Sequence, residues 1–112
     1  MKVNILGTEY TIKECTVDED SYLQEYDCDG YCDKSSKEIV ICKERKDCQL
    51  KNWEWYRKKV IRHEIIHAFL YESGLAENFE HANKFGQEET MVDWIATQFP
   101  KILEVYKEVG CL

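Results

Sequence analysis

The chain has 112 residues, of which 44% are hydrophobic and 33% are charged, and its formal net charge is −7. This composition is typical of a globular protein, and we expect a single domain over residues 1–112. An acidic chain lacks the clustered Lys and Arg that bind phosphates, so we expect no nucleic-acid partner. No apolar run reaches the roughly 18 residues of a membrane span. The sequence therefore predicts no membrane contact and a cytoplasmic location.

The first half of the chain predicts three β-strands. Residues 2–15 match two strands around a glycine-containing turn, which is the pattern of a β-hairpin. Residues 16–36 are acidic and rich in turn residues, so we expect a loop there with at most one helical turn. β-Branched residues are concentrated in 37–44, which predicts the third strand. We expect these strands to form a small three-stranded antiparallel sheet.

From about Lys51 the hydrophobic spacing becomes helical. Apolar residues recur every three or four positions up to Gly74, which predicts a long helix with Asn52 as its N-cap and Gly74 in a left-handed C-cap. We expect a connecting loop over 75–87 and a second helix after it. Pro100 should kink or break that helix, because proline lacks the backbone N–H. The expected fold class is α+β, with the small sheet packed on the long helix and on the C-terminal one.

The long helix carries the pattern His63-Glu64-Ile65-Ile66-His67. Side chains four residues apart project from nearly the same face of a helix, so both imidazoles can bind one zinc ion. Glu64 is rotated by about 100° from His63. It can therefore act beside the metal as the general base that takes a proton from a zinc-activated water. The alternative is a merely polar helix face, but the apolar neighbours favour the metal site, since buried polar groups need partners.

A catalytic zinc ion needs a third protein ligand from elsewhere in the chain. The candidates are Glu89, Glu88 and His81. Glu89 is favoured, because Asp93 follows it by one helical turn and would accept the N–H of a ligand histidine. Glu88 would replace Glu89 if the helix phase differs. Its other interpretation is an acidic residue stabilised by the helix dipole.

The six cysteines are a further candidate for metal binding. Cys28, Cys32, Cys42 and Cys48 could supply four thiolates, but their spacings of three, nine and five residues are not those of a zinc ribbon or knuckle. A disulfide framework depends on a secretory context, which the sequence does not show. We therefore expect reduced thiols and one catalytic Zn²⁺ ion, with a second, cysteine-bound zinc as the less favoured alternative.

The segments HEIIH and EETMVD together resemble the gluzincins, thermolysin-like zinc peptidases with a His-Glu-x-x-His helix and a later glutamate-bearing helix. The chain length and the strand–helix order resemble the minigluzincins. HEIIHAFLYESGL and MVDWIATQFPKI are also similar to small phage and mobile-element metallopeptidases of the ImmA/IrrE type. The resemblance covers residues 55–105. It implies zinc binding by His63, His67 and Glu89, general base catalysis by Glu64, and orientation of a ligand histidine by Asp93.

The resemblance also implies a reaction and a partner. The chain would hydrolyse peptide bonds, with a protein or peptide substrate paired along an edge strand formed by 37–44. No residue is identified as the oxyanion donor; Tyr71 is available, although a core aromatic is its other interpretation. Some minigluzincins are latent, with their own C-terminus in the cleft. The tail VYKEVGCL could do the same here, and Cys111 could then reach the zinc ion. The alternatives are a non-catalytic or latent regulatory module of a phage or mobile element with the same fold, and a metal-free helical regulator.

Overall fold

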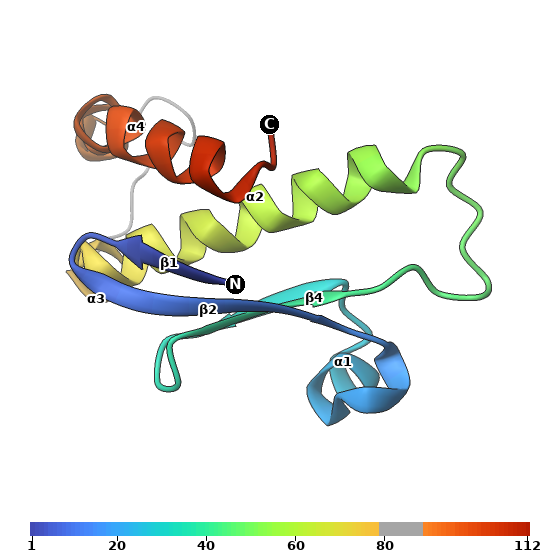
Figure 1. Ribbon diagram of the computed structural model, residues 1–112. Helices are drawn as coiled ribbons and strands as arrows, with labels where there is room; N and C mark the ends of the chain where they lie inside the picture. The colour runs from blue at the N-terminus through green and yellow to red at the C-terminus, as the bar shows by residue number, and fades with distance from the viewer. Residues whose placement is uncertain (79–88) are drawn as a thin grey trace.

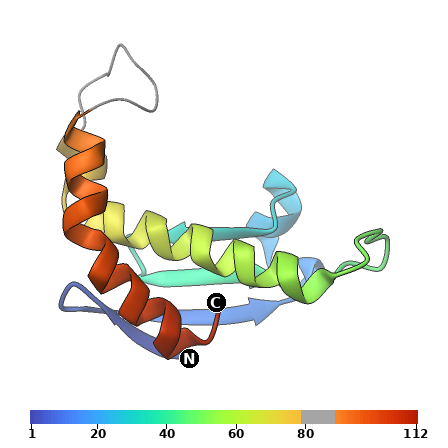
Figure 2. The same ribbon diagram turned by 90° about the horizontal axis from the view of Figure 1, so that it is seen from above.

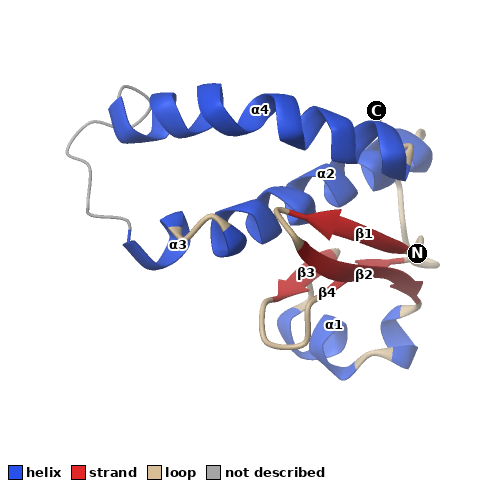
Figure 3. Ribbon diagram, turned by 60° about the vertical axis from the view of Figure 1, so that its left-hand side comes forward, coloured by secondary structure: helices blue, strands red, loops and turns tan. Residues whose placement is uncertain are grey.

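The computed structural model describes residues 1–78 and 89–112 (Figure 1). Its elements, in chain order, are β1 (Lys2–Ile5), β2 (Thr8–Cys15), the 3-10 turn η1 (Val17–Glu19), α1 (Ser21–Tyr26), β3 (Gly30–Asp33), β4 (Glu38–Cys42), α2 (Trp53–Glu72), α3 (Leu75–Asn78) and α4 (Glu89–Val109). The sheet lies between α2 and α4 on one side and α1 on the other (Figures 1 and 3). The predicted α+β class is therefore confirmed.

The sheet differs from the predicted one in strand number and direction. It has four strands in the order β1-β2-β4-β3. The β1–β2 and β3–β4 pairs are antiparallel, whereas β2 and β4 are parallel, so the predicted three-stranded antiparallel sheet is wrong. The additional strand, β3, lies in 16–36. With four residues, of which Gly30 and Asp33 are turn formers, it is too short to show a strand pattern in the sequence. Together with α1 it returns the chain so that β4 can run parallel to β2.

β4 is an inner strand of the sheet. The strand predicted over 37–44 is confirmed, but its predicted position at an edge is wrong, because Ile41 is paired with Glu14 of β2 and with Gly30 of β3. The residues from Ile39 to Cys42 are buried. Such a continuous apolar run fits a strand that is covered on both faces. The edges of the sheet are β1 and β3, and β3 is the edge that packs against α2.

Two apolar clusters hold the layers together. The larger one joins α2 and α4 to one face of the sheet, and its fully buried members include Ile5, Tyr10, Ile39, Ile65 and Phe69. These strand residues alternate with others that point away, as the two-residue period of a strand requires. The smaller cluster joins α1 to the opposite face and contains Leu23, Val40 and Cys42.

The long helix α2 begins and ends where the sequence predicts. The Oδ1 atom of Asn52 accepts a hydrogen bond from the backbone N–H of Trp55 at 3.0 Å, which is the N-cap interaction. Gly74 has a φ of +82°, and its N–H donates to the carbonyl of Tyr71 at 3.2 Å. Both predicted caps are therefore confirmed, because each depends only on neighbouring residues.

A partly buried ion pair joins the last turn of α2 to the sheet. The carboxylate of Glu72 accepts hydrogen bonds from Lys37 Nζ at 2.7 Å, from the Tyr10 hydroxyl at 2.7 Å and from Thr8 Oγ1 at 2.9 Å. The hydrogen bond from Lys37 is the largest cause that lowers the pKa of Glu72, and the Tyr10 and Thr8 hydroxyls lower it further. Charged hydrogen bonds of this kind fix the direction of α2 across the strands.

The helix α4 crosses over α2, as the view from above shows (Figure 2). Trp94 Nε1 donates to Ser73 Oγ at 2.9 Å, so the beginning of α4 lies at the end of α2. The helix continues through Pro100, so of the predicted kink or break the break does not occur. Pro100 is exposed, so the carbonyl that loses its N–H partner can bond to water instead. Among residues 1–78 and 89–112, no helix is long and apolar enough to cross a bilayer.

The C-terminal tail packs into the core. Cys111 is 1% exposed, and its carbonyl accepts a hydrogen bond from Arg62 Nη1 at 2.7 Å. The hydroxyl of Tyr106 donates to the backbone carbonyl of Arg62 at 3.3 Å. The expectation that Cys111 reaches a metal is wrong, because Cys111 does not form a group with His63 and His67 that could hold a metal ion among the described residues.

Candidate metal centre

The two histidines of α2 lie against each other. Their Nε2 atoms are 3.2 Å apart, and their ring centroids are 4.9 Å apart with an interplanar angle of 70°. Two nitrogens that each lie about 2.0–2.1 Å from one tetrahedral zinc ion are separated by about 3.3 Å. The separation between His63 and His67 therefore fits a shared metal ion. It also suits an N–H···N hydrogen bond between two neutral rings, so the neighbouring groups have to discriminate between these interpretations.

The protonation of His67 fits the role of a ligand. Burial lowers its pKa, and the nearby His63 ring lowers it further. A metal ligand has to be a neutral imidazole, so both effects favour the form that binds. His63 is exposed and His67 is half-buried, although the apolar sequence around them predicts burial. The side of α2 that carries the rings is thus open to a hollow.

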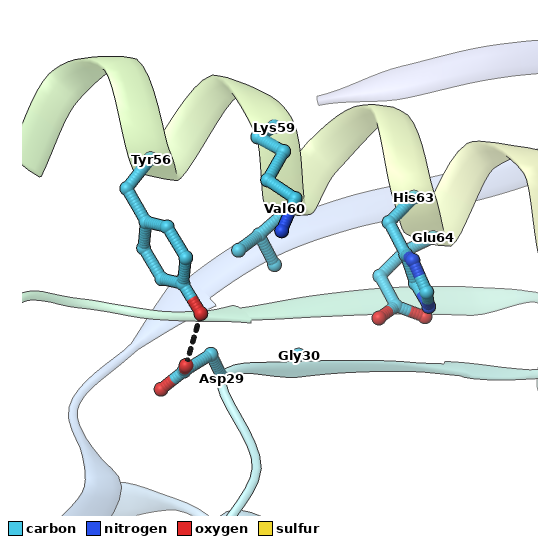
Figure 4. A pocket seen from close by; sticks show the side chains of 7 residues that line it. All are labelled: Asp29, Gly30, Tyr56, Lys59, Val60, His63 and Glu64. Atoms are coloured by element: carbon cyan, nitrogen blue, oxygen red, sulfur yellow. Dashed lines mark hydrogen bonds between the residues drawn. The ribbon is translucent and has the colours of Figure 1, made fainter.

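Glu64 is the buried carboxylate beside this pair. It is 6% exposed, and burial raises its pKa to about 7. A general base that works at neutral pH needs a pKa near that value. The side chains of His63 and Glu64 both extend from α2 toward β3 (Figure 4). The predicted position of the acid next to the imidazoles is therefore present in the structure.

The edge strand β3 approaches α2 most closely at Gly30. A Cβ atom at this position would lie 2.9 Å from Val60 Cγ1, 3.0 Å from the carbonyl oxygen of Val40 and 3.3 Å from Glu64 Cγ. Only glycine leaves room for this approach. The sequence predicts a loop over 16–36 and gives no sign of this contact, although a glycine within a strand often marks close backbone packing.

A first hollow of about 270 Å³ lies on the N-terminal side of the histidines (Figure 4). The Tyr56 hydroxyl donates to Asp29 Oδ2 at 2.6 Å, and Lys59 Nζ lies 5.6 Å from the centroid of the Tyr56 ring. The remaining lining residues are Gly30, Val60, His63 and Glu64. This part of the site is polar and carries both a carboxylate and an ammonium group.

A second hollow of about 280 Å³ lies on the side of His67. It shares Gly30, His63 and Glu64 with the first, so the two hollows adjoin at the candidate metal centre. The rest of its lining consists of Tyr22, Tyr26, Cys28, Tyr31, Cys32, His67 and Tyr71. Tyr71 therefore borders the site rather than the core. The sequence does not reveal Tyr22, Tyr26 and Tyr31 as a group, because they belong to two elements, α1 and β3, and have no single spacing.

The predicted third ligand lies on the second long helix. Glu89 and Asp93 belong to α4, as predicted, but their side chains lie outside the described part of the structure, as do Glu88 and His81 entirely. Within the described residues, no group of three His, Cys, Asp or Glu side chains is placed to hold a metal ion. Ser73, which bonds to Trp94 near the beginning of α4, follows His67 by six residues, or about 9 Å along α2. Of the predicted site residues, the structure brings together His63, Glu64 and His67.

Among the described residues, the four cysteines of the alternative zinc site do not form a group of three or more side chains that could hold a metal ion. Cys32 packs against the core cluster under α2, whereas Cys28 and Cys42 belong to the cluster on the opposite face of the sheet. Burial, and then the nearby Glu64 carboxylate, raise the pKa of Cys32 to about 12. Its sulfur is therefore a thiol at neutral pH and a poor metal ligand.

No protein-family model, curated protein or solved structure matches this chain. The fold and the site define an α+β protein with a histidine pair and a buried carboxylate on one helix, next to the edge strand of a mixed sheet.

Proposed function

We propose that the protein is a zinc-dependent peptidase of the gluzincin-like kind. The observation that carries the proposal is the pair of Nε2 atoms 3.2 Å apart, with the buried Glu64 carboxylate next in the chain. A polar helix face that served only solubility would not bury an acid. The resemblance of HEIIH and EETMVD to the gluzincin motifs supports the same function.

His63 and His67 would hold the zinc ion, with Glu89 as the third ligand and Asp93 orienting one of the rings. Glu88 is the alternative third ligand. When bound, zinc supplies a Lewis acid that polarises the substrate carbonyl and lowers the pKa of water. The two imidazoles fit this group, because their Nε2 atoms lie 3.2 Å apart, close to the separation of two nitrogens on one zinc ion.

The chain itself supplies the base and the place for the substrate. Glu64 takes the proton of the attacking water and holds it until the leaving amine needs it, for which a pKa of about 7 is suited. A peptide substrate would lie along β3, whose outer side pairs with no other strand within 1–78 and 89–112, and not along the inner strand β4. The close contact at Gly30 brings this edge next to Glu64.

The proposal is tested by the zinc content and the peptidase activity of matched variants. Wild type should bind about one zinc ion per chain and cleave an unfolded protein such as casein. Glu64→Gln should keep the zinc and lose cleavage, whereas His67→Ala and Glu89→Ala should lose both. Glu54→Gln, an exposed acid on the first turn of α2, serves as the control and should change neither.

Three results would count against the proposal or modify it. Cleavage by Glu64→Gln would remove the general base from the mechanism. A wild-type chain that takes up no zinc would favour the metal-free regulator. Zinc binding without any cleavage would support the non-catalytic module, and loss of zinc in Glu88→Ala instead of Glu89→Ala would exchange the third ligand.

A further inference from the structure

The hollow beside His67 has a wall of tyrosine rings. The ring centroid of Tyr22 lies 4.4 Å from that of Tyr26 and 4.3 Å from that of Tyr31. On α2, the ring of Tyr71 stacks on the ring of His67, with 6.4 Å between the ring centroids and an interplanar angle of 24°. All four tyrosines line the same space of about 280 Å³. An aromatic surface therefore borders the candidate metal centre directly.

The Tyr31 ring and the backbone of α1 are held in place by Asp20. The Tyr31 hydroxyl donates to Asp20 Oδ2 at 2.7 Å, and Asp20 Oδ1 accepts from the backbone N–H groups of Tyr22 and Leu23 at 2.9 and 3.0 Å. Leu23 is fully buried and anchors α1 under the sheet. Tyr22 and Tyr26 nevertheless remain 43% and 60% exposed. Their ring faces are thus accessible and lie on a helix whose position is already fixed, which reduces the entropic cost of binding.

Charged groups of both signs lie near the hollow, so charge alone favours neither a cationic nor an anionic occupant. Lys34 Nζ lies 5.4 Å from the centroid of the Tyr71 ring, so a second cation would be repelled there. An acidic side chain would meet Glu64 on the other side of the space. The Cys28 and Cys32 thiols add no charge, because burial raises the pKa of each. A neutral side chain fits best.

The size of the hollow limits the occupant to one side chain. Sites for small molecules and cofactors have volumes of roughly 300–1,000 Å³, and this space falls just below that range. Aromatic pairs prefer ring centroids about 4.5–7 Å apart and gain energy beyond burial. The 6.4 Å between the His67 and Tyr71 rings equals about two residues of an extended chain. An occupying residue would therefore lie within two residues of the peptide bond at the histidines.

We propose that this tyrosine-walled hollow is a specificity subsite that receives a phenylalanine or tyrosine side chain of the peptide substrate, within two residues of the cleaved bond. The assignment rests on the proposed function for its substrate, but the ring wall itself is independent of the metal. α1 and β3, which carry three of the four rings, thereby act as the selective part of the fold.

The test measures peptide binding to a chain that cannot cleave. Full-length Glu64→Gln, with and without zinc, is titrated calorimetrically with capped Gly/Ala heptapeptides that carry one central Phe, Leu, Lys or Glu. The Phe peptide should bind roughly three- to tenfold more tightly than the Leu peptide, which is the range of one aromatic pair. In the Glu64→Gln background, Tyr26→Leu and Tyr22→Leu should remove this difference, whereas Tyr26→Phe should keep it. Trp55→Leu is the matched control, because Trp55 is also 60% exposed but lies outside the hollow.

Each outcome decides between the two proposals. Equal affinities for all four peptides, or an equal loss in Trp55→Leu, would overturn the subsite. Cleavage of these peptides by the wild type with no preference for Phe would also overturn it and leave the peptidase in place. A Phe preference that depends on Tyr26, in a chain that neither binds zinc nor cleaves, would keep the subsite and overturn the peptidase.

Discussion

Replacing Gly30 by alanine tests the contact that joins the sheet edge to the candidate catalytic helix. The new Cβ would lie 2.9 Å from Val60 Cγ1 and 3.0 Å from the backbone oxygen of Val40, both closer than normal carbon contacts. Overpacking of this kind costs about 1–3 kcal/mol. The backbone of Gly30 does not have a positive φ, so the lower chain entropy of alanine offsets roughly 0.4–1 kcal/mol of this cost. We expect a net loss of about 1–2 kcal/mol in the free energy of unfolding.

Urea denaturation followed by tryptophan fluorescence measures this loss, with an unchanged dependence on urea as the sign of two-state unfolding. The double variant Gly30→Ala/Val60→Ala should be more stable than the sum of the single variants, by about 0.5–1 kcal/mol. The compensation is partial, because the carbonyl oxygen of Val40 stays in place. A Gly30→Ala variant as stable as the wild type, or strictly additive with Val60→Ala, would refute the close approach.

The same substitution should affect activity more than metal binding. The added Cβ would lie 3.3 Å from Glu64 Cγ, whereas the histidine rings are not among its nearest contacts. A displacement of about 1 Å at a reacting group can reduce the rate by roughly a hundredfold. We therefore expect Gly30→Ala to retain zinc while its peptidase activity falls, and a parallel loss of both would contradict this reasoning.

Three further changes have defined outcomes. Asp93→Asn should weaken zinc binding by about 10–100-fold without abolishing it, as competition with a chelator would show. Glu72→Gln should lower the unfolding free energy by about 1–3 kcal/mol at pH 7. Because the hydrogen bond from Lys37 lowers the pKa of Glu72, this difference from the wild type should vanish as the pH falls below that pKa. A difference in melting temperature that persists at pH 2 would contradict it. Iodoacetamide at pH 8 should label Cys48 well before Cys32, whose pKa is raised to about 12, as peptide mass spectrometry can resolve.

The features that the sequence predicts correctly depend on near neighbours in the chain. Asn52 and Gly74 cap α2 because the groups that they bind lie three residues away. His63 and His67 meet because a helix repeats every 3.6 residues, so the spacing alone brings their rings together. The hairpin of β1 and β2 is equally local, with Leu6 and Gly7 at positive φ in its turn.

What only the tertiary structure decided are the relations between distant segments. The parallel pairing of β2 with β4, the position of β3 at the edge and the seating of Gly30 under Glu64 join residues far apart in sequence, and no periodicity encodes them. The tyrosine wall arises in the same way, from rings of α1, β3 and α2 that share one hollow. The sequence of one helix thus determined the paired imidazoles. The surface that would select a substrate was determined by how that helix packs against the sheet, because packing depends on shape and burial across the whole chain.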